Sequence, residues 1–227
     1  VWTITRRLRE QAPARYGACL DFGDHAIVSN SPELFIDVDT QRTIRTRPIK
    51  GTRPRQLGME RELLDSAKDA AELNMIIDLE RNDLGRICQI GSVRVEQPRM
   101  IEAHPTVYHG VATVSAKLCD DVGFVEILRA MFPGGSITGA PKIRAMQIID
   151  ELEAARRGVY CGAIGWLGSG GVMQFNVAIR TIVIRDEVAT FSVGGGIVAD
   201  SEPDAEYEET IVKAKAMLTA LNARIEI

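Results

Sequence analysis

The sequence is poor in histidine and contains no paired cysteines. Three histidines occur in 227 residues, and Cys19, Cys88, Cys119 and Cys161 are scattered without a C-x-x-C spacing. A zinc site made of histidine and cysteine ligands is therefore not expected. Scattered thiols are more typical of reduced cytoplasmic proteins than of disulfide frameworks, so we expect a cytoplasmic protein.

The sequence also lacks a long apolar run and a dense block of positive charge. No apolar stretch reaches the ~18 residues of a membrane-spanning helix, and the net charge is -4 without a cluster of Lys and Arg. Nucleic acids and membrane surfaces are bound mainly through clustered positive charge. We therefore expect neither as a partner, which leaves small molecules and other proteins.

Composition and hydrophobic pattern predict one compact unit of mixed α/β structure. A hydrophobic content of 45% with 26% charged residues is ordinary for a globular chain. Strand patterns fill residues 16–49 as an antiparallel meander and recur at 92–97, 107–118, 160–167, 173–184 and 188–193. Helices are expected over 59–83, 122–131, 141–156 and 203–221. The apolar stripe of the first helix is expected at Leu63, Ala67, Ala70, Ala71, Met75 and Leu79.

A glycine-rich stretch, Phe132-Pro-Gly-Gly-Ser-Ile-Thr-Gly-Ala-Pro-Lys142, lies between two of these helices. Its hydroxyls and the free N–H groups at the start of the following helix could bind a carboxylate or a phosphate. A Walker loop is excluded, because Ala140-Pro141 separates the last glycine from Lys142 and no Ser or Thr follows. An ordinary loop that caps the helix remains an equal alternative.

Two helical patterns carry rows of charged residues. Asp65, Asp69 and Glu72 stand at i, i+4 and i+7, and the last helix carries Glu206, Glu209 and Lys213 at i, i+3 and i+7. Magnesium prefers one or two protein carboxylates together with ligand oxygens and water, so these faces could bind it. Solvated faces with helical charge pairing are the more common alternative.

Four further features are candidates for binding or catalysis. Arg180 in an apolar strand needs a charged partner, either a substrate carboxylate or a buried acid. His109 could be a general acid or base or a structural histidine. Lys50, at a strand end before a glycine, could be a nucleophile or an exposed, inert lysine. Backbone N–H groups at Gly194-Gly-Gly196 could face an anion.

The order of these motifs closely resembles the chorismate-utilising enzyme family. That family includes anthranilate synthase component I, aminodeoxychorismate synthase component I, isochorismate synthase and salicylate synthase. The matching motifs are Ser31-Pro-Glu33, Pro48-Ile-Lys-Gly-Thr52, Ala71-Glu72 with Asp78-Leu-Glu-Arg-Asn-Asp83, Gly134 to Lys142, Gly194 to Asp200 and Glu206 to Lys213. Lys50 resembles the aminodeoxychorismate synthase subfamily, because anthranilate and isochorismate synthases usually carry alanine there.

The resemblance implies a fold and a set of site residues. The implied fold is α/β (α+β), a sandwich of mostly antiparallel β-sheets with outer helices, as in anthranilate synthase component I. The implied catalytic residues are Lys50, Glu33 and His109. The implied substrate-binding residues are Ser136, Tyr160, Arg180, Gly195, Gly196 and Lys213. Magnesium would be held by Glu72 and Glu209, with Asp69 and Glu206 close by, and would bind the ring carboxylate of chorismate.

The resemblance also implies an activity and a partner. The reaction is the amination of chorismate to 4-amino-4-deoxychorismate, on the route to 4-aminobenzoate and folate, with ammonia delivered by a glutamine amidotransferase. Family members generally have a further N-terminal half, so residues 1–227 resemble a chorismate-binding catalytic domain at the C-terminal end of a larger enzyme. The alternatives are anthranilate synthesis and a non-catalytic remnant that binds chorismate or a partner protein.

Overall fold

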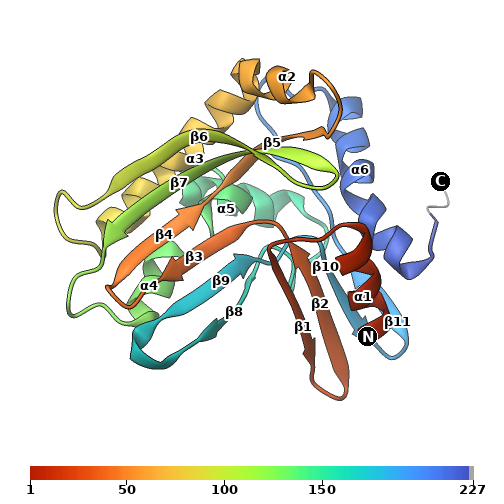
Figure 1. The fold of residues 1–227 in the computed structure, drawn as a ribbon, viewed down its shortest axis with the longest axis horizontal. Helices are drawn as coiled ribbons and strands as arrows, with labels where there is room; N and C mark the ends of the chain where they lie inside the picture. The colour runs from red at the N-terminus through yellow and green to blue at the C-terminus, as the bar shows by residue number, and fades with distance from the viewer. Residues whose placement is uncertain (225–227) are drawn as a thin grey trace. The chain divides into compact units, whose positions relative to one another are not determined.

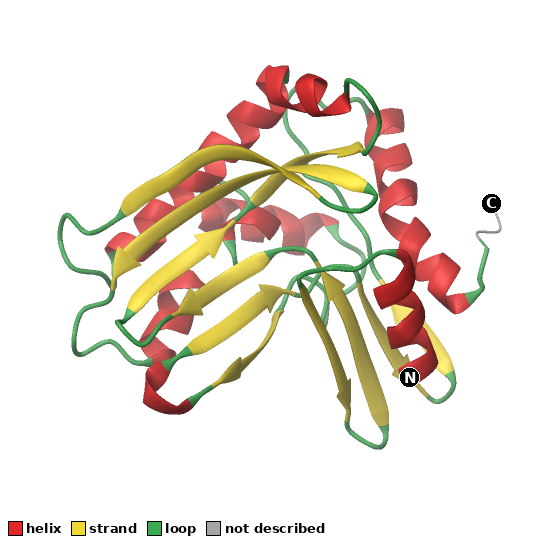
Figure 2. Cartoon of the chain, viewed as in Figure 1, coloured by secondary structure: helices red, strands yellow, loops and turns green. Residues whose placement is uncertain are grey.

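The computed structural model describes residues 1–224 and divides them into two compact units. Unit 1 contains Val1–Pro32, Arg157–Ile164 and the chain from Asn176 onward, and unit 2 contains Glu33–Arg156 and Gly165–Phe175. Figure 1 follows the chain through both units, and Figure 2 distinguishes helices from strands. None of the helices in the described residues is both long and apolar enough to cross a membrane.

Unit 1 is built on a four-stranded antiparallel sheet covered by two helices. The strand order is β1-β2-β10-β11, and each neighbouring pair is antiparallel. The strands are β1 (Tyr16–Asp21), β2 (His25–Ser31), β10 (Thr181–Arg185) and β11 (Val188–Phe191), and the helices are α1 (Trp2–Gln11) and α6 (Pro203–Leu221). The predicted helix over 203–221 is confirmed.

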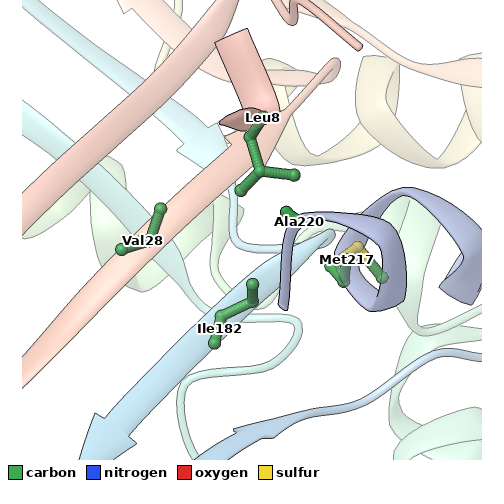
Figure 3. Packing of buried hydrophobic residues seen from close by; sticks show 5 residues of the cluster. All are labelled: Leu8, Val28, Ile182, Met217 and Ala220. Carbon is green, nitrogen blue, oxygen red and sulfur yellow. The ribbon is translucent and has the colours of Figure 1, made fainter. Parts of the chain in front are cut away.

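The core of unit 1 joins the two helices to the two central strands. Val28 and Ile182 stand opposite each other on β2 and β10, and their side chains face Leu8 of α1 together with Met217 and Ala220 of α6 (Figure 3). Each of these side chains is at most 2% exposed. Because burial of apolar area stabilises a fold by about 25 cal/mol per Å², this cluster holds α1 and α6 on the sheet.

The second sheet has seven strands in the order β5-β7-β4-β3-β9-β8, with β6 also paired to β7, and unit 2 contains β3 to β7 and parts of β8 and β9. Along one edge of β7 the chain pairs first as β4 and then as β5, and the amide of Ala112 donates to the Pro48 carbonyl where the two strands meet. The strands are β3 (Leu34–Val38), β4 (Thr43–Arg47), β5 (Ile49–Pro54), β6 (Arg94–Ala103), β7 (Val107–Lys117), β8 (Ala163–Leu167) and β9 (Met173–Val177). The expected mixed α/β fold with mostly antiparallel strands and outer helices is confirmed.

The helices of unit 2 lie on one face of this sheet (Figure 2). The longest, α3, packs on β5, β6 and β7. The helical elements of this unit are α2 (Met59–Asp65), α3 (Ala67–Gly85), α4 (Phe124–Met131), the single turn η1 (Gly135–Ile137), α5 (Lys142–Leu152) and the single turn η2 (Ser169–Gly171).

The prediction of one helix over 59–83 is wrong. Ser66 is extended, with φ -67° and ψ 109°, and its hydroxyl accepts the amide of Asp69, so it caps a second helix. The expected apolar stripe is wrong within α3, where Ala67, Ala71 and Met75 are exposed, whereas Leu63 of α2 is fully buried as expected. The buried apolar residues of α3 are Leu73, Ile76, Ile77 and Leu84.

Two predictions about strands are also wrong. The strands in residues 16–49 do not form one meander, because β2 pairs with β10 in one sheet while β3 pairs with β4 in another. The stretch 173–184 is not one strand, because Arg180 adopts φ 51° between β9 and β10. β10 and β11 form a hairpin, with Asp186 and Glu187 both at positive φ as a two-residue turn requires.

Candidate functional site

Lys50 lies at a β-bulge in unit 2. The register between β5 and β7 shifts between Ile49 and Thr52, and Gly51 within the bulge has φ +79°. A Cβ on Gly51 would stand 2.6 Å from Leu63 Cδ1 and 2.8 Å from Asp69 Cγ, so only glycine fits. A bulge re-aims the side chains beside it. The half-buried Lys50 Nζ donates to the carbonyl of Ser136, 3.2 Å away in η1, which brings two predicted site residues together.

His109 lies on β7 opposite the same segment. Its Nδ1 is 3.0 Å from Thr52 Oγ1, and its ring meets the ring of His104 edge to face at 5.0 Å. The side chain is buried. The next residue must be glycine, because a Cβ on Gly110 would stand 2.5 Å from the Lys50 carbonyl oxygen. His109 is therefore fixed on the strand beside the one that carries Lys50.

Glu33 is buried just before β3 and acts on a second buried carboxyl, Glu80 of α3. Burial and the neighbouring Glu33 raise the pKa of Glu80 to about 8, while a hydrogen bond from the Thr46 side chain opposes the shift. Sequence reasoning missed Glu80. It follows Leu73, Ile76 and Ile77 in helical phase, and that spacing could have revealed it.

The glycine-rich loop packs tightly in unit 2. A Cβ on Gly135 would stand 2.9 Å from Leu79 Cδ2, and Thr138 Oγ1 donates to the Gly134 carbonyl. Lys142 Nζ is 2.5 Å from Asp83 Oδ2 and donates also to the Met131 carbonyl. These contacts give the loop lysine partners within the protein, and α5 begins after Pro141 without a side-chain cap from the loop.

In unit 1, the charged residues of α6 meet the glycine run that follows β11. Lys213 Nζ lies 2.5 Å from Glu209 Oε1 and donates to the Gly194 carbonyl at 2.9 Å. Glu206 accepts a hydrogen bond from the Ser201 hydroxyl. A Cβ on Gly195 would stand 3.0 Å from Glu206 Oε2. The backbone of Gly195 therefore lies beside one acidic and one basic side chain, and the next residue, Gly196, is exposed.

Arg180 and Tyr160 belong to the same cluster. Arg180 NH1 donates to the Lys213 carbonyl at 3.2 Å, and burial lowers the pKa of its guanidinium, against the effect of Tyr160 and Glu209. A Cβ on Gly194 would stand 2.8 Å from Tyr160 Oη. Unit 1 thus brings together two basic groups, a phenol and glycine backbone, which together can bind a carboxylate.

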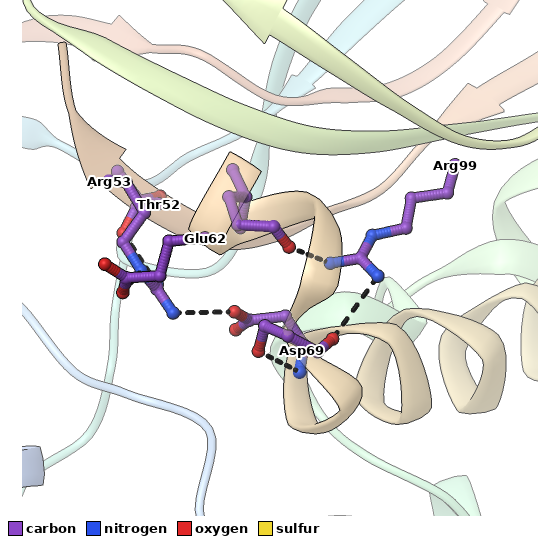
Figure 4. Close-up of polar contacts among 7 residues, drawn as sticks. Thr52, Arg53, Glu62, Asp69 and Arg99 are labelled. Carbon is purple, nitrogen blue, oxygen red and sulfur yellow. Dashed lines mark hydrogen bonds and ion pairs between the residues drawn. The ribbon is translucent and has the colours of Figure 1, made fainter. Parts of the chain in front are cut away.

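The three carboxylates expected on one helix face do not share it. Asp65 ends α2, is exposed and pairs with Arg61, because the helix breaks at Ser66. Asp69 of α3 pairs instead with Arg53 at 3.0 Å, and Arg53 also bonds Glu62 (Figure 4). Glu72 lies half-buried on the same helix.

The predicted magnesium ligands are distributed over both units. Within each unit, the described residues contain no group of three or more His, Cys, Asp or Glu side chains that could hold a metal ion. Unit 2 supplies Asp69 and Glu72, and unit 1 supplies Glu206 and Glu209. A pair of carboxylates suits magnesium, which completes its shell with ligand oxygens and water. The site drawn from these residues stays a prediction.

The fold and these clusters define an α+β protein with basic and backbone groups suited to a small anionic ligand. A family model described as chorismate binding enzyme matches residues 1–219. The chain therefore belongs to the chorismate-binding enzyme family, as the sequence motifs predicted.

Known relatives within this family carry two different activities in their names. Aminodeoxychorismate synthase component 1 of Salmonella typhimurium is 46% identical over 97% of this chain and 50% of its own length. Anthranilate synthase component 1 of Pseudomonas aeruginosa is also 46% identical, over 96% of this chain and 45% of its own length. Overall identity therefore does not separate the two activities.

The family fold extends over nearly all of the chain. The crystal structure of anthranilate synthase component I from Streptococcus pneumoniae TIGR4 matches with a TM-score of 0.86 and 40% identity, over 94% of this chain and 48% of that one. The chain spans between 31% and 50% of the length of the curated relatives that it matches.

Proposed function

We propose that the protein containing this chain aminates chorismate to 4-amino-4-deoxychorismate. The observation that carries the proposal is Lys50 on its glycine bulge, with Nζ 3.2 Å from the Ser136 carbonyl. Anthranilate synthases resemble this chain elsewhere but usually carry alanine at this position. A lysine amine is suited to covalent catalysis on a small substrate.

The reaction consists of two displacements. Lys50, as the neutral amine, attacks ring carbon 2 while the 4-hydroxyl leaves as water with a proton from Glu33. Ammonia then adds at carbon 4 and expels Lys50, so the substituent returns to the original face of the ring. Glu33 regains its proton from the new ammonium group. His109 is assigned the role of a further acid or base, and its contact with the Thr52 hydroxyl near Lys50 supports this.

Substrate binding is assigned to the charged clusters. Arg180, Tyr160 and Lys213 with the Gly195-Gly196 backbone bind the enolpyruvyl carboxylate, and their gathering in unit 1 supports this role. Ser136 lines the ring pocket beside Lys50. Glu72 and Glu209, with Asp69 and Glu206, would hold magnesium, which would supply positive charge to neutralise the ring carboxylate.

A glutamine amidotransferase subunit is the proposed source of ammonia. Relatives named component 1 support this, because such a name implies a second component. None of the four cysteines lies in a glycine-rich nucleophile turn with a suitable histidine downstream, so we expect the chain not to use glutamine directly. We also place the protein in the cytoplasm, in keeping with four free cysteines in the structure.

The test is the product formed by the full-length protein from chorismate, magnesium and ammonium salt. Wild type should yield aminodeoxychorismate, and without ammonia mass spectrometry should find an adduct on the peptide that contains Lys50. Lys50→Ala should lose activity by ~10² to 10⁴-fold. The exposed Lys215→Ala on α6 is the matched control and should keep full activity. Anthranilate as the product, or an active Lys50→Ala without any adduct in wild type, would contradict the proposal.

A further inference from the structure

Glu80 is a carboxyl buried in unit 2 without an assigned role. It is 5% exposed, as is Glu33, and the two side chains are neighbours. Its oxygen Oε2 has no hydrogen-bond partner in the part of the chain that the structure describes. An ionised oxygen in such a place would lose its hydration without compensation, so the buried acid favours its neutral form.

The sheet and the loop together create this environment. Leu34 of β3 stands opposite Arg47 of β4, so Glu33 and Thr46 lie at the same end of neighbouring strands. Glu80 reaches them from α3, where its side chain accepts a hydrogen bond from Thr46. A Cβ on Gly135 would stand 3.7 Å from Glu80 Cγ, so η1 covers Glu80. That same turn provides the carbonyl to which Lys50 donates.

The charged groups around Glu80 do not include a cation that pairs with it in the described residues. Asp83 of α3 and Lys142 of α5 act on it with opposite sign, and these two pair with each other at 2.5 Å. Arg45 and Arg47 lie on the other face of β4 from Thr46, where they pair with Asp39 and Glu102. The strongest charged influence on Glu80 is therefore Glu33.

Two carboxyls that share a buried site do not ionise at the same pH, because the second charge must form beside the first. Between their two ionisations the pair holds one proton and one charge. Burial and Glu33 raise the pKa of Glu80 to about 8, so the singly protonated pair spans neutral pH. The two carboxyls therefore titrate as a coupled pair.

We propose that Glu80 is a positioning residue for Glu33: the two carboxyls share one proton, which keeps Glu33 able to donate it at neutral pH. The inference rests on the proposed function, in which Glu33 protonates the leaving hydroxyl. When that proton leaves as water, two buried charges remain. Their repulsion favours the return of a proton to Glu33 from the product ammonium, which closes the cycle.

The first test is the pH dependence of kcat/KM for chorismate, measured on the full-length protein at constant free ammonia. Wild type should lose activity on the alkaline side near pH 8. Glu80→Gln removes the neighbouring charge, so Glu33 should lose its proton at lower pH and the alkaline limb should move down by about one unit or more. Thr46→Val removes a hydrogen bond that stabilises ionised Glu80, so the limb should move up.

Opposite shifts distinguish this role from structural damage, which would lower activity at every pH in both variants. The exposed Asp78→Asn on the same helix is the control and should leave the profile unchanged. An unchanged limb in Glu80→Gln, or shifts of the same sign in Glu80→Gln and Thr46→Val, would overturn the inference.

A second readout does not depend on the reaction. Infrared spectroscopy of the full-length protein should show a protonated carboxyl at pH 7 that titrates near pH 8, and this titration should move to lower pH in both Glu80→Gln and Glu33→Gln. Absence of the signal of a protonated carboxyl in wild type would overturn the inference that the two side chains share a proton. If the titration behaves as expected but no aminodeoxychorismate is formed, the proposed function fails while the shared proton stands.

Discussion

At the scale of single residues, Gly51 determines where Lys50 can point. Its positive φ is unfavourable for a residue with a Cβ, and the space beside it is filled by Leu63 and Asp69. The bulge therefore depends on glycine for two separate reasons, the backbone conformation and the close contact.

Gly51→Ala should destabilise the protein more than a change at another glycine of similar φ. Both Gly51→Ala and Gly58→Ala force alanine to positive φ, at about 1 to 3 kcal/mol each. Only Gly51→Ala adds a clash, because nothing lies within 4 Å of a Cβ on Gly58. Urea unfolding of the full-length protein measures both changes, and equal losses of stability would mean that the contact with Leu63 and Asp69 contributes nothing.

The sequence revealed residues with distinctive chemistry and missed residues that are charged but buried. Lys50 and Ser136 were predicted as site residues, and they are in contact. Glu80 and Asp83 were noted only within a matching motif, and their burial was not predicted, because charged side chains are rarely buried. Their burial depends on Glu33, Thr46 and Lys142, which come from distant parts of the chain and leave no mark in a local pattern.

At the scale of elements, α6 is attached to the sheet of unit 1 through a few apolar side chains. Met217 is fully buried between the helix and β10, and it belongs to the cluster that also includes Leu8 of α1. Glu206, Glu209 and Lys213 lie one to three turns before Met217 and Ala220 on the same side of the helix, where Glu206 and Lys213 meet the glycine run. The position of the charged cluster therefore depends on the apolar packing further along the helix.

Met217→Ala should cost about 2 to 5 kcal/mol of stability, because a fully buried side chain is lost and a cavity remains. Val212→Ala on the same helix is the control, since Val212 is 68% exposed and its loss should change stability by about 0.5 kcal/mol or less. Denaturant unfolding of the full-length protein gives both values. A cost at Met217 as small as that at Val212 would show that α6 is held by other contacts.

Element types were predictable from hydrophobic period, but their boundaries and sheet membership were not. The helix over 203–221 has clear helical spacing and was placed correctly. The break at Ser66 depends on one hydroxyl that caps Asp69, a signal that the continuous apolar pattern on either side concealed. The alternation of apolar and polar residues along a strand does not indicate which sheet the strand joins. For this reason β2 and β3 were assigned to one meander.

At the scale of the whole molecule, the proposed substrate and much of the proposed site are negatively charged. Chorismate carries two carboxylates, and Asp69, Glu72, Glu206 and Glu209 add further acids. A divalent cation would reduce this repulsion. The proposal therefore predicts that the full-length protein requires magnesium.

Activity should disappear in excess chelator and return when magnesium is added. Glu209→Ala should lower magnesium affinity or activity by ~10-fold to 100-fold or more. Substitutions around metal sites typically have effects of this size. The neighbouring Glu208→Ala is exposed and outside the predicted ligand set, so it serves as the control. Steady-state rates over a magnesium titration provide the measurement, and full turnover in excess chelator would rule out the metal requirement.

The path of the chain through unit 1 limits the order of events during synthesis. The core of this unit joins Leu8, near the start of the sequence, to Met217 and Ala220 in the last helix. Residues 33–156 of unit 2 form one uninterrupted stretch between these parts. A ribosome therefore exposes α1, β1 and β2 long before α6 leaves the exit tunnel. During that interval the apolar face of β2 has no native cover from α6, and it is a surface that chaperones can recognise.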